Sequence, residues 1–251
     1  GGLTTYSFDL AGNMIARQTA ELRARGEQIA YGYEFNRLES ISYPLYPENS
    51  VRYDYGAPGA ADNGAGRIVH IQCQAGTEDR AYDRLGSIVC QTKAIDSTIP
   101  GHSDEPLERY TTLLALDTWG RLQALMYPDG ERLWYKYDSG WRTASLEGNN
   151  NGVPFTYIPR LYYDEFELPV LREAGNDAVT QYRYDALTGF RANLETDPKK
   201  GNRFQNLKYE YDAIGNIVRL RNDVPVPPPN EFGGPVALDL VYDDFYRLAE
   251  A

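Results

Sequence analysis

Four residues of this sequence carry the side chains that most often bind metals or act as nucleophiles: His70, His102, Cys73 and Cys90. Neither histidine belongs to a His-x-x-x-His pair, and neither cysteine belongs to a Cys-x-x-Cys pair. Zinc sites are built on such spacings. We therefore predict neither a metal nor a cofactor. His70 is expected on a half-buried strand, and His102 in a solvated loop.

The two cysteines are expected on different strands, separated by one intervening strand over Asp79 to Tyr82. Two strand spacings amount to about 9–10 Å, which exceeds the Cα separation of about 7 Å that a disulfide can bridge. Free, packed thiols are therefore favoured over the alternative, a disulfide in a secreted protein.

Acidic residues are numerous, with 36 Asp and Glu in total, and any two of them could be imagined as a glycosidase pair. Without distances, that pairing carries no information. The sequence has no Gly-x-Ser-x-Gly, and Gly64-Ala65-Gly66 lacks both the third glycine and the following helix of a phosphate-binding loop. We predict that the chain is not an enzyme.

A more informative pattern is a phrase that recurs along the whole chain, Tyr-x-Tyr-Asp-x-x-Gly-Asn, whose clearest copy spans Tyr209 to Asn216. Its acidic markers are Asp9, Glu34, Asp54, Asp83, Asp117, Asp138, Asp164, Asp185, Asp212 and Asp243. The shorter spacings lie close to 21 residues and the longer ones scatter, as expected for a fixed repeat with loop insertions. Such repetition indicates a structural array.

Tyrosines, glycines and one asparagine complete the predicted repeat signature. The signature residues besides the markers are Tyr6, Gly12, Tyr33, Tyr53, Tyr82, Gly86, Gly120, Tyr137, Gly140, Tyr163, Tyr184, Tyr211, Gly215, Asn216 and Tyr242. Their aspartates are interpreted as turn formers and not as catalytic acids, because Asp at the first and Gly at the fourth position suit a type I turn.

Each repeat is predicted to be one β-hairpin. Between Asp117 and Asp138, the extended runs 120–127 and 131–137 flank Pro128-Asp129-Gly130, which is a strong turn signal. Side chains of a strand alternate between its faces, so Leu207, Tyr209 and Tyr211 should share one face. The fold class predicted is all-β, an array of nine to ten hairpins forming a curved, spiralling antiparallel sheet. Residues 15–29 contain good helix formers but are predicted as two strands.

Loop insertions are expected mostly at the turn opposite the signature, where proline and glycine suit exposed connections. These insertions span residues 94–107, 147–154, 197–202 and 224–235, whereas 56–66 lies on the signature side.

The charge of −11 disfavours nucleic acid as a partner, because phosphate binding needs clustered lysine and arginine. No apolar run approaches the roughly 18–20 residues that span a bilayer, and no signal peptide precedes Tyr6. Strand-like sequence continues to Ala251 without a cap, although repeat arrays normally need one. Residues 1–251 are therefore expected to be a single repeat segment of a longer polypeptide.

The signature resembles the YD repeats of bacterial Rhs proteins and of the B and C subunits of ABC-type Tc insecticidal toxins. The phrases at Tyr31 to Leu38 and Tyr242 to Ala251 add to this resemblance. It implies a strip of β-sheet that closes into a hollow shell around a toxin effector. The partners implied are that effector, the remainder of the B/C toxin chain and a translocation-channel subunit. A secreted complex is implied, without direct membrane insertion.

Two hallmarks of that family are not matched. The Asp-Pro-x-Gly core sequence is represented only by Asp197-Pro198 in an insertion loop, and no effector-like tail follows the repeats. We therefore assign the chain to the shell wall, without cleavage chemistry. The alternative is an extracellular adhesion or carbohydrate-binding surface, in which Trp119, Trp134 and Trp141 would form an aromatic platform.

Overall fold

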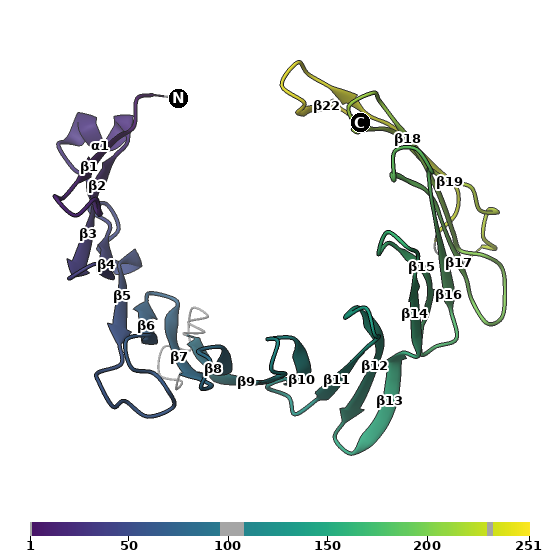
Figure 1. The fold of residues 1–251 in the computed structure, drawn as a ribbon. Coiled ribbons are helices and arrows are strands. Elements are labelled where there is room, and N and C mark those ends of the chain that lie inside the picture. Colours follow the sequence, from purple (N-terminus) through teal and green to yellow (C-terminus); the bar gives the residue numbers. More distant parts are fainter. Residues whose placement is uncertain (1, 96–107, 230–232) are drawn as a thin grey trace. The chain divides into compact units, whose positions relative to one another are not determined.

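The computed structural model describes residues 2–95, 108–229 and 233–251, and these residues form two compact units, Gly1–Gly130 and Glu131–Ala251 (Figure 1). Each unit is built of antiparallel strands that pair with their neighbours in chain order. This arrangement confirms the prediction of an all-β array of hairpins. The prediction for His102 falls outside the described residues.

The first unit contains ten strands, one short α-helix and one turn of 3-10 helix among its described residues. These elements are β1 (Thr5–Phe8), β2 (Met14–Gln18), α1 (Ala20–Arg25), β3 (Ile29–Glu34), β4 (Arg37–Ser42), η1 (Pro47–Asn49), β5 (Val51–Tyr55), β6 (Ile68–Cys73), β7 (Gly76–Tyr82), β8 (Ile88–Ile95), β9 (Glu108–Leu116) and β10 (Leu122–Met126).

The second unit begins with the three-stranded run β11 (Arg132–Tyr137), β12 (Thr143–Asn150) and β13 (Val153–Ile158). A seven-stranded sheet follows, with a final two-stranded hairpin. Their strands are β14 (Arg160–Tyr163), β15 (Pro169–Glu173), β16 (Val179–Tyr184), β17 (Arg191–Asp197), β18 (Gln205–Tyr211), β19 (Ile217–Asn222), β20 (Val236–Asp239), β21 (Val241–Tyr242) and β22 (Leu248–Glu250).

Helix α1 corrects the prediction that residues 15–29 are only strands. Thr19 caps its first turn by accepting a hydrogen bond from the Leu22 backbone, and Gly26 ends it in the left-handed region at φ 70°. Leu22 is buried, which fixes the helix against its unit. No described helix is long and apolar enough to cross a membrane.

The predicted insertion at 147–154 is also wrong, because β12 and β13 run through it as a long hairpin. The turn between them is Asn151-Gly152, and both residues have positive φ, 50° and 88°. Asn-Gly is the preferred pair for such a two-residue hairpin turn. Pro154 is accommodated in β13, which pairs with β12 and is the last strand of its sheet.

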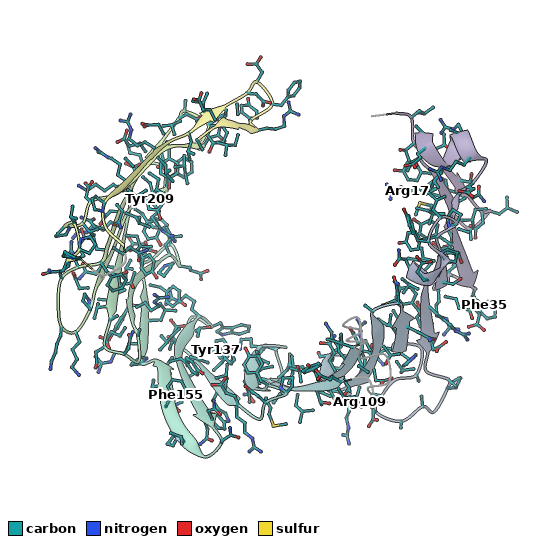
Figure 2. All side chains as sticks on the ribbon, turned by 180° about the vertical axis from the view of Figure 1, so that it is seen from behind. Arg17, Phe35, Arg109, Tyr137, Phe155 and Tyr209 are labelled. Atoms are coloured by element: carbon teal, nitrogen blue, oxygen red, sulfur yellow. The ribbon has the colours of Figure 1, made fainter. Side chains whose placement is uncertain are left out.

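The sheet of the second unit has two chemically different faces. Directly opposed residues of antiparallel strands share a face, and the register places Tyr182, Leu194 and Leu207 in one row. This tyrosine face also carries Tyr209 and Leu220, which oppose each other. Figure 2 shows side chains standing on both sides of the ribbon, with Tyr209 labelled.

The opposite, charged face carries a set of cross-strand ion pairs. Arg183 lies near Glu195, Lys208 near Asp223 and Arg219 near Glu210, at 3.8, 2.7 and 3.7 Å. No large side chain among the described residues is completely buried, so this described part of the chain has no thick core of the kind that forms between two packed layers. The tyrosine face is consequently the main apolar surface of this sheet.

The two cysteines lie on opposite faces of the first unit's sheet. Cys73 on β6 shares the face of Ile71 and Glu78, whereas Cys90 on β8 opposes Ala81 on the other face. Strand β7 separates them, as predicted. Both thiols are free.

Candidate functional site

The signature aspartates organise the turns that connect the strands of each hairpin. In the turn of Asp212, the backbone N–H groups of Ile214 and Asn216 donate to Oδ1 at 3.0 and 2.9 Å, and the Asn216 amide donates to Oδ2 at 2.9 Å. Gly215 closes the turn by donating to the Asp212 carbonyl at 3.2 Å, with φ 95°. Most of the turn's polar groups are thereby satisfied locally.

The same aspartate-centred turn recurs in both units. Its aspartates are Asp9, Asp83, Asp117, Asp138, Asp164, Asp185, Asp212 and Asp243. In Asp185 the turn is one residue longer, with the Asp185 backbone donating to the carbonyl of Phe190. These contacts are structural, because Oδ1 of each carboxylate accepts hydrogen bonds from the backbone of its turn.

Hydrogen bonding stabilises the ionised form of several of these carboxylates. The side chain of Arg247 lowers the pKa of Asp243, and the side chain of Asn13 does the same for Asp9. At Asp138 and Asp185 the largest cause of the lowered pKa is a backbone donor, from Arg142 and Thr188 respectively. Hydrogen bonds to a carboxylate favour its charged form.

The structure does not place Gly140 in the left-handed position of its turn. Trp141 occupies that position with φ 71°, because its N–H donates to the Asp138 carbonyl and Gly140 comes one residue too early. Glu167 and Tyr246 take the same place in their turns, at φ 65° and 58°. The repeat therefore tolerates side chains where glycine was predicted, at a cost in backbone strain.

Asp54 and Glu34 are not turn aspartates of this type. Asp54 lies within β5, where its carboxylate accepts a hydrogen bond from Arg52 at 3.0 Å. The strand ends one residue later, at Tyr55. Tyr55 therefore holds the position before the turn that was predicted for Tyr53, two residues earlier. Glu34 pairs with Arg37 across the tight turn at Phe35.

In several hairpins of both units, a tyrosine at or near the end of a strand links its hairpin to the preceding one, and we call this hydrogen bond a tyrosine latch. In each latch the phenol donates to a backbone carbonyl of the previous repeat. The latches are Tyr33 to Met14, Tyr55 to Leu38, Tyr82 to Ile68, Tyr163 to Thr143, Tyr184 to Pro169, Tyr211 to Arg191 and Tyr242 to Ile217, at 2.5–3.2 Å.

The acceptor carbonyls share a position in the sheet. Arg191 is the residue that pairs with Tyr184 where the ladder shifts register, and it accepts the latch of Tyr211. Pro169 has the same relation to Tyr163 and Tyr184. A bulge interrupts the regular ladder bonds, so the latch supplies a donor at the interruption.

Arginine side chains lie over several latch tyrosines. Arg37 lies 5.0 Å from the ring centre of Tyr55, and Arg142 lies 4.8 Å from that of Tyr163. Such cation–π contacts are worth about 0.5–1 kcal/mol at exposed positions. They reinforce the link between neighbouring repeats.

The residues that could have done chemistry are arranged differently. His70 is half-buried and its Nδ1 lies 2.6 Å from Asp79 Oδ1 on the neighbouring strand, with Asp54 opposite it on the other side. Within the part of the chain that the structure describes, no group of three or more His, Cys, Asp or Glu could hold a metal ion.

The tryptophans of the alternative adhesion surface occupy two kinds of position. Trp119 and Trp141 lie in signature turns of different units, whereas Trp134 lies in β11 on the face opposite Leu133 and Tyr135. One tryptophan of the second unit is therefore on a strand and the other in a turn, and the two do not form a row along one strand face.

Comparison with known proteins shows similarity to toxin subunits. No family model matches the chain. Toxin subunit YenC1 of Yersinia entomophaga is 30% identical over 154 residues, which cover 56% of this chain and 14% of that protein. The chain thus spans about one seventh of this relative.

Solved structures match over 98% of the chain. The crystal structure of TcdB2-TccC3-Cdc42 has a TM-score of 0.78 at 23% identity, and the Photorhabdus luminescens Tc holotoxin pore with the TccC3-D651A mutation has 0.72 at 22%. The chain covers 13% of each matched chain. In sequence the chain therefore shows partial homology to the Tc toxin subunit YenC1, and in fold it matches the TcdB2-TccC3 structures.

Proposed function

We propose that this chain is a segment of the wall of a Tc-type shell that encloses and protects a toxin polypeptide. The observation that carries the proposal is the one-layer sheet of the second unit, with a tyrosine face and an ion-paired charged face. An apolar sheet face is stable only where something covers it. A wall around a polypeptide would provide that cover without helices.

The proposal includes the chain's place in a larger molecule. Residues 1–251 would be one YD-repeat segment of a longer B/C-type chain, since the relatives are several times longer. Its partners would be the rest of that chain, the enclosed effector and a translocation-channel subunit, in a secreted complex. The role in this scheme is structural, as the carboxylates of the repeats already serve their turns.

Native mass spectrometry of the assembly that contains these residues tests the proposal. We expect the 251 residues within a much longer polypeptide, together with a separate polypeptide that stays associated under native conditions and leaves on denaturation. A free-standing protein of this size without an associated polypeptide would contradict the shell and favour the adhesion surface.

The cysteines provide a second test, because each reports on a different face. In the first unit's sheet, Cys73 shares a face with Ile71 and the opposing Tyr53, and Cys90 lies on the other face. In the native assembly we expect a bulky charged maleimide to label Cys90 faster than Cys73, relative to the denatured protein. The reverse order would mean that the face of Tyr53 and Cys73 is the exposed one and would count against the shell.

A further inference from the structure

The latch tyrosines of the second unit differ in what lies beside them. Arg142 follows the turn of Asp138, donates from Nε to Asp138 Oδ2 at 2.9 Å, and places its guanidinium 4.8 Å from the ring centre of Tyr163. A guanidinium is thus held between the carboxylate of one turn and the latch ring of the next.

The following repeat has the same groups but lacks the arginine. Leu168 stands four residues after Asp164, where Arg142 stands after Asp138, and the next latch tyrosine is Tyr184. Among the described residues, no side chain donates to Asp164 Oδ2. The donors to the next aspartate, Asp185, all reach Oδ1.

A cavity of about 570 Å³ lies between these two turns. Phe166, Leu168, Val170 and Leu187 give it an apolar lining, to which Tyr182 and Tyr184 add their rings.

The charged groups that line this cavity are all acidic. They are the carboxylates of Asp164, Glu165 and Asp185. The nearest cation on the tyrosines is Arg191, 5.2 Å from the ring of Tyr182 and 5.9 Å from that of Tyr184, and it does not line the cavity. An acidic cavity with apolar and aromatic walls suits a cation that has an apolar stem.

We propose that this cavity binds an arginine side chain of another polypeptide segment. The guanidinium would lie where that of Arg142 lies one repeat earlier. It would donate to Asp164 Oδ2 beside the ring of Tyr184. Its aliphatic stem would lie against Phe166 and Leu187. Arginine is favoured over lysine because its planar, weakly hydrated head both stacks on an aromatic ring and donates to a carboxylate. If the shell proposal holds, the enclosed polypeptide is the natural source of that segment, but the site itself does not depend on enclosure.

Titration of the 251-residue chain with a blocked Gly-Arg-Gly peptide, followed by NMR of labelled Leu and Val methyl groups, tests the site. We expect the signals of Leu168, Val170 and Leu187 to shift with the arginine peptide. The peptide in which citrulline replaces arginine has nearly the same shape without the charge, and it should shift them several-fold less. Equal shifts with both peptides would overturn the proposal.

Two variants separate this cavity from general attraction to an acidic protein. Leu168→Arg supplies the guanidinium internally and should abolish the shifts of Val170 and Leu187. Asp164→Asn keeps an Oδ1 acceptor for the turn but removes the charge, and should weaken binding several-fold. The control Glu250→Gln removes one negative charge at an exposed position outside the cavity, and it should leave binding unchanged.

Unaltered binding to either folded cavity variant would overturn the proposal. If Leu168→Arg fails to fold, the comparison of Asp164→Asn with Glu250→Gln decides the matter alone. Failure of the shell proposal would appear separately, as the absence of an enclosed polypeptide in native mass spectrometry.

Discussion

The phenol of Tyr211 donates to the backbone carbonyl of Arg191 at 2.9 Å, across the boundary between two consecutive hairpins. The ring of Phe190 lies 4.9 Å from that of Tyr211, so the same tyrosine is fixed by an apolar contact as well. One side chain therefore joins the end of a strand to the turn before it.

Tyr211→Phe removes this hydrogen bond and keeps the ring. We expect the free energy of unfolding to fall by about 0.5–1.5 kcal/mol, the usual net value of a hydrogen bond. Chemical denaturation measures it. Tyr162→Phe is the matched control, because Tyr162 is 47% exposed and no described residue accepts a hydrogen bond from its hydroxyl. Equal losses in both variants would show that the latch contributes nothing of its own.

Gly215→Val should destabilise the fold by about 1–3 kcal/mol, because a β-branched residue would be forced to φ 95°. The new Cβ would also meet the ring of Phe190, at 2.8 Å from its nearest atom. Thermal unfolding should show a lower midpoint. Ala213→Val places the same side chain at an exposed position of the same turn with ordinary φ, and an equal effect there would refute the turn assignment.

Acidification should weaken the fold through the turn aspartates. Folded-state pKa values of Asp9, Asp138, Asp185 and Asp243 lie below the ordinary value. Groups of this kind stabilise the folded state above the unfolded pKa of about 3.9, and the contribution is lost as the pH falls through the folded pKa. Urea denaturation between about pH 6 and pH 2 should therefore show stability declining below about pH 4. Asp138→Asn should make that decline shallower, and an unchanged slope would contradict the assignment.

The hydroxyls of Thr180 and Thr196 form a buried pair, 3.0 Å apart, with exposures of 2% and 4%. Thr196 also donates to Gln205 at 2.9 Å. Thr196→Val should cost about 1–3 kcal/mol, because it leaves buried partners unsatisfied. The double variant Thr180→Val/Thr196→Val should lose less stability than the sum of the two single variants. A double-mutant cycle measures this difference. Strict additivity would mean that the two hydroxyls do not stabilise each other.

Much of the fold could be predicted from the alternation of apolar and polar residues along the strands. Leu207, Tyr209 and Tyr211 were predicted to share one face of a strand, and the register of β18 places them so. This works because the side-chain period of a strand is two regardless of what surrounds it. The latches could not be predicted, since each joins residues 14–25 positions apart through a carbonyl freed by a register shift.

Turn positions were harder to predict where the signature is ambiguous. In Tyr53-Asp54-Tyr55-Gly56 either tyrosine could end the strand. The choice is made outside this phrase, by the loop that follows it: Asp62 accepts from the Tyr82 backbone and the Asn63 amide donates to the Tyr82 carbonyl. In the Asp138 turn, Gly140 was predicted at the position of positive φ, but that position falls one residue later, at Trp141.

The tyrosine latches have a consequence for how such a chain can change its length. Each latch reaches only the repeat before it. Each added repeat therefore contributes to the free energy of unfolding through its own hairpin and one new boundary. Duplicating or deleting a whole repeat then conserves every type of contact and alters only their number. Stability would grow with repeat number as a sum of nearest-neighbour terms, and evolution could extend or shorten the sheet without redesigning any boundary.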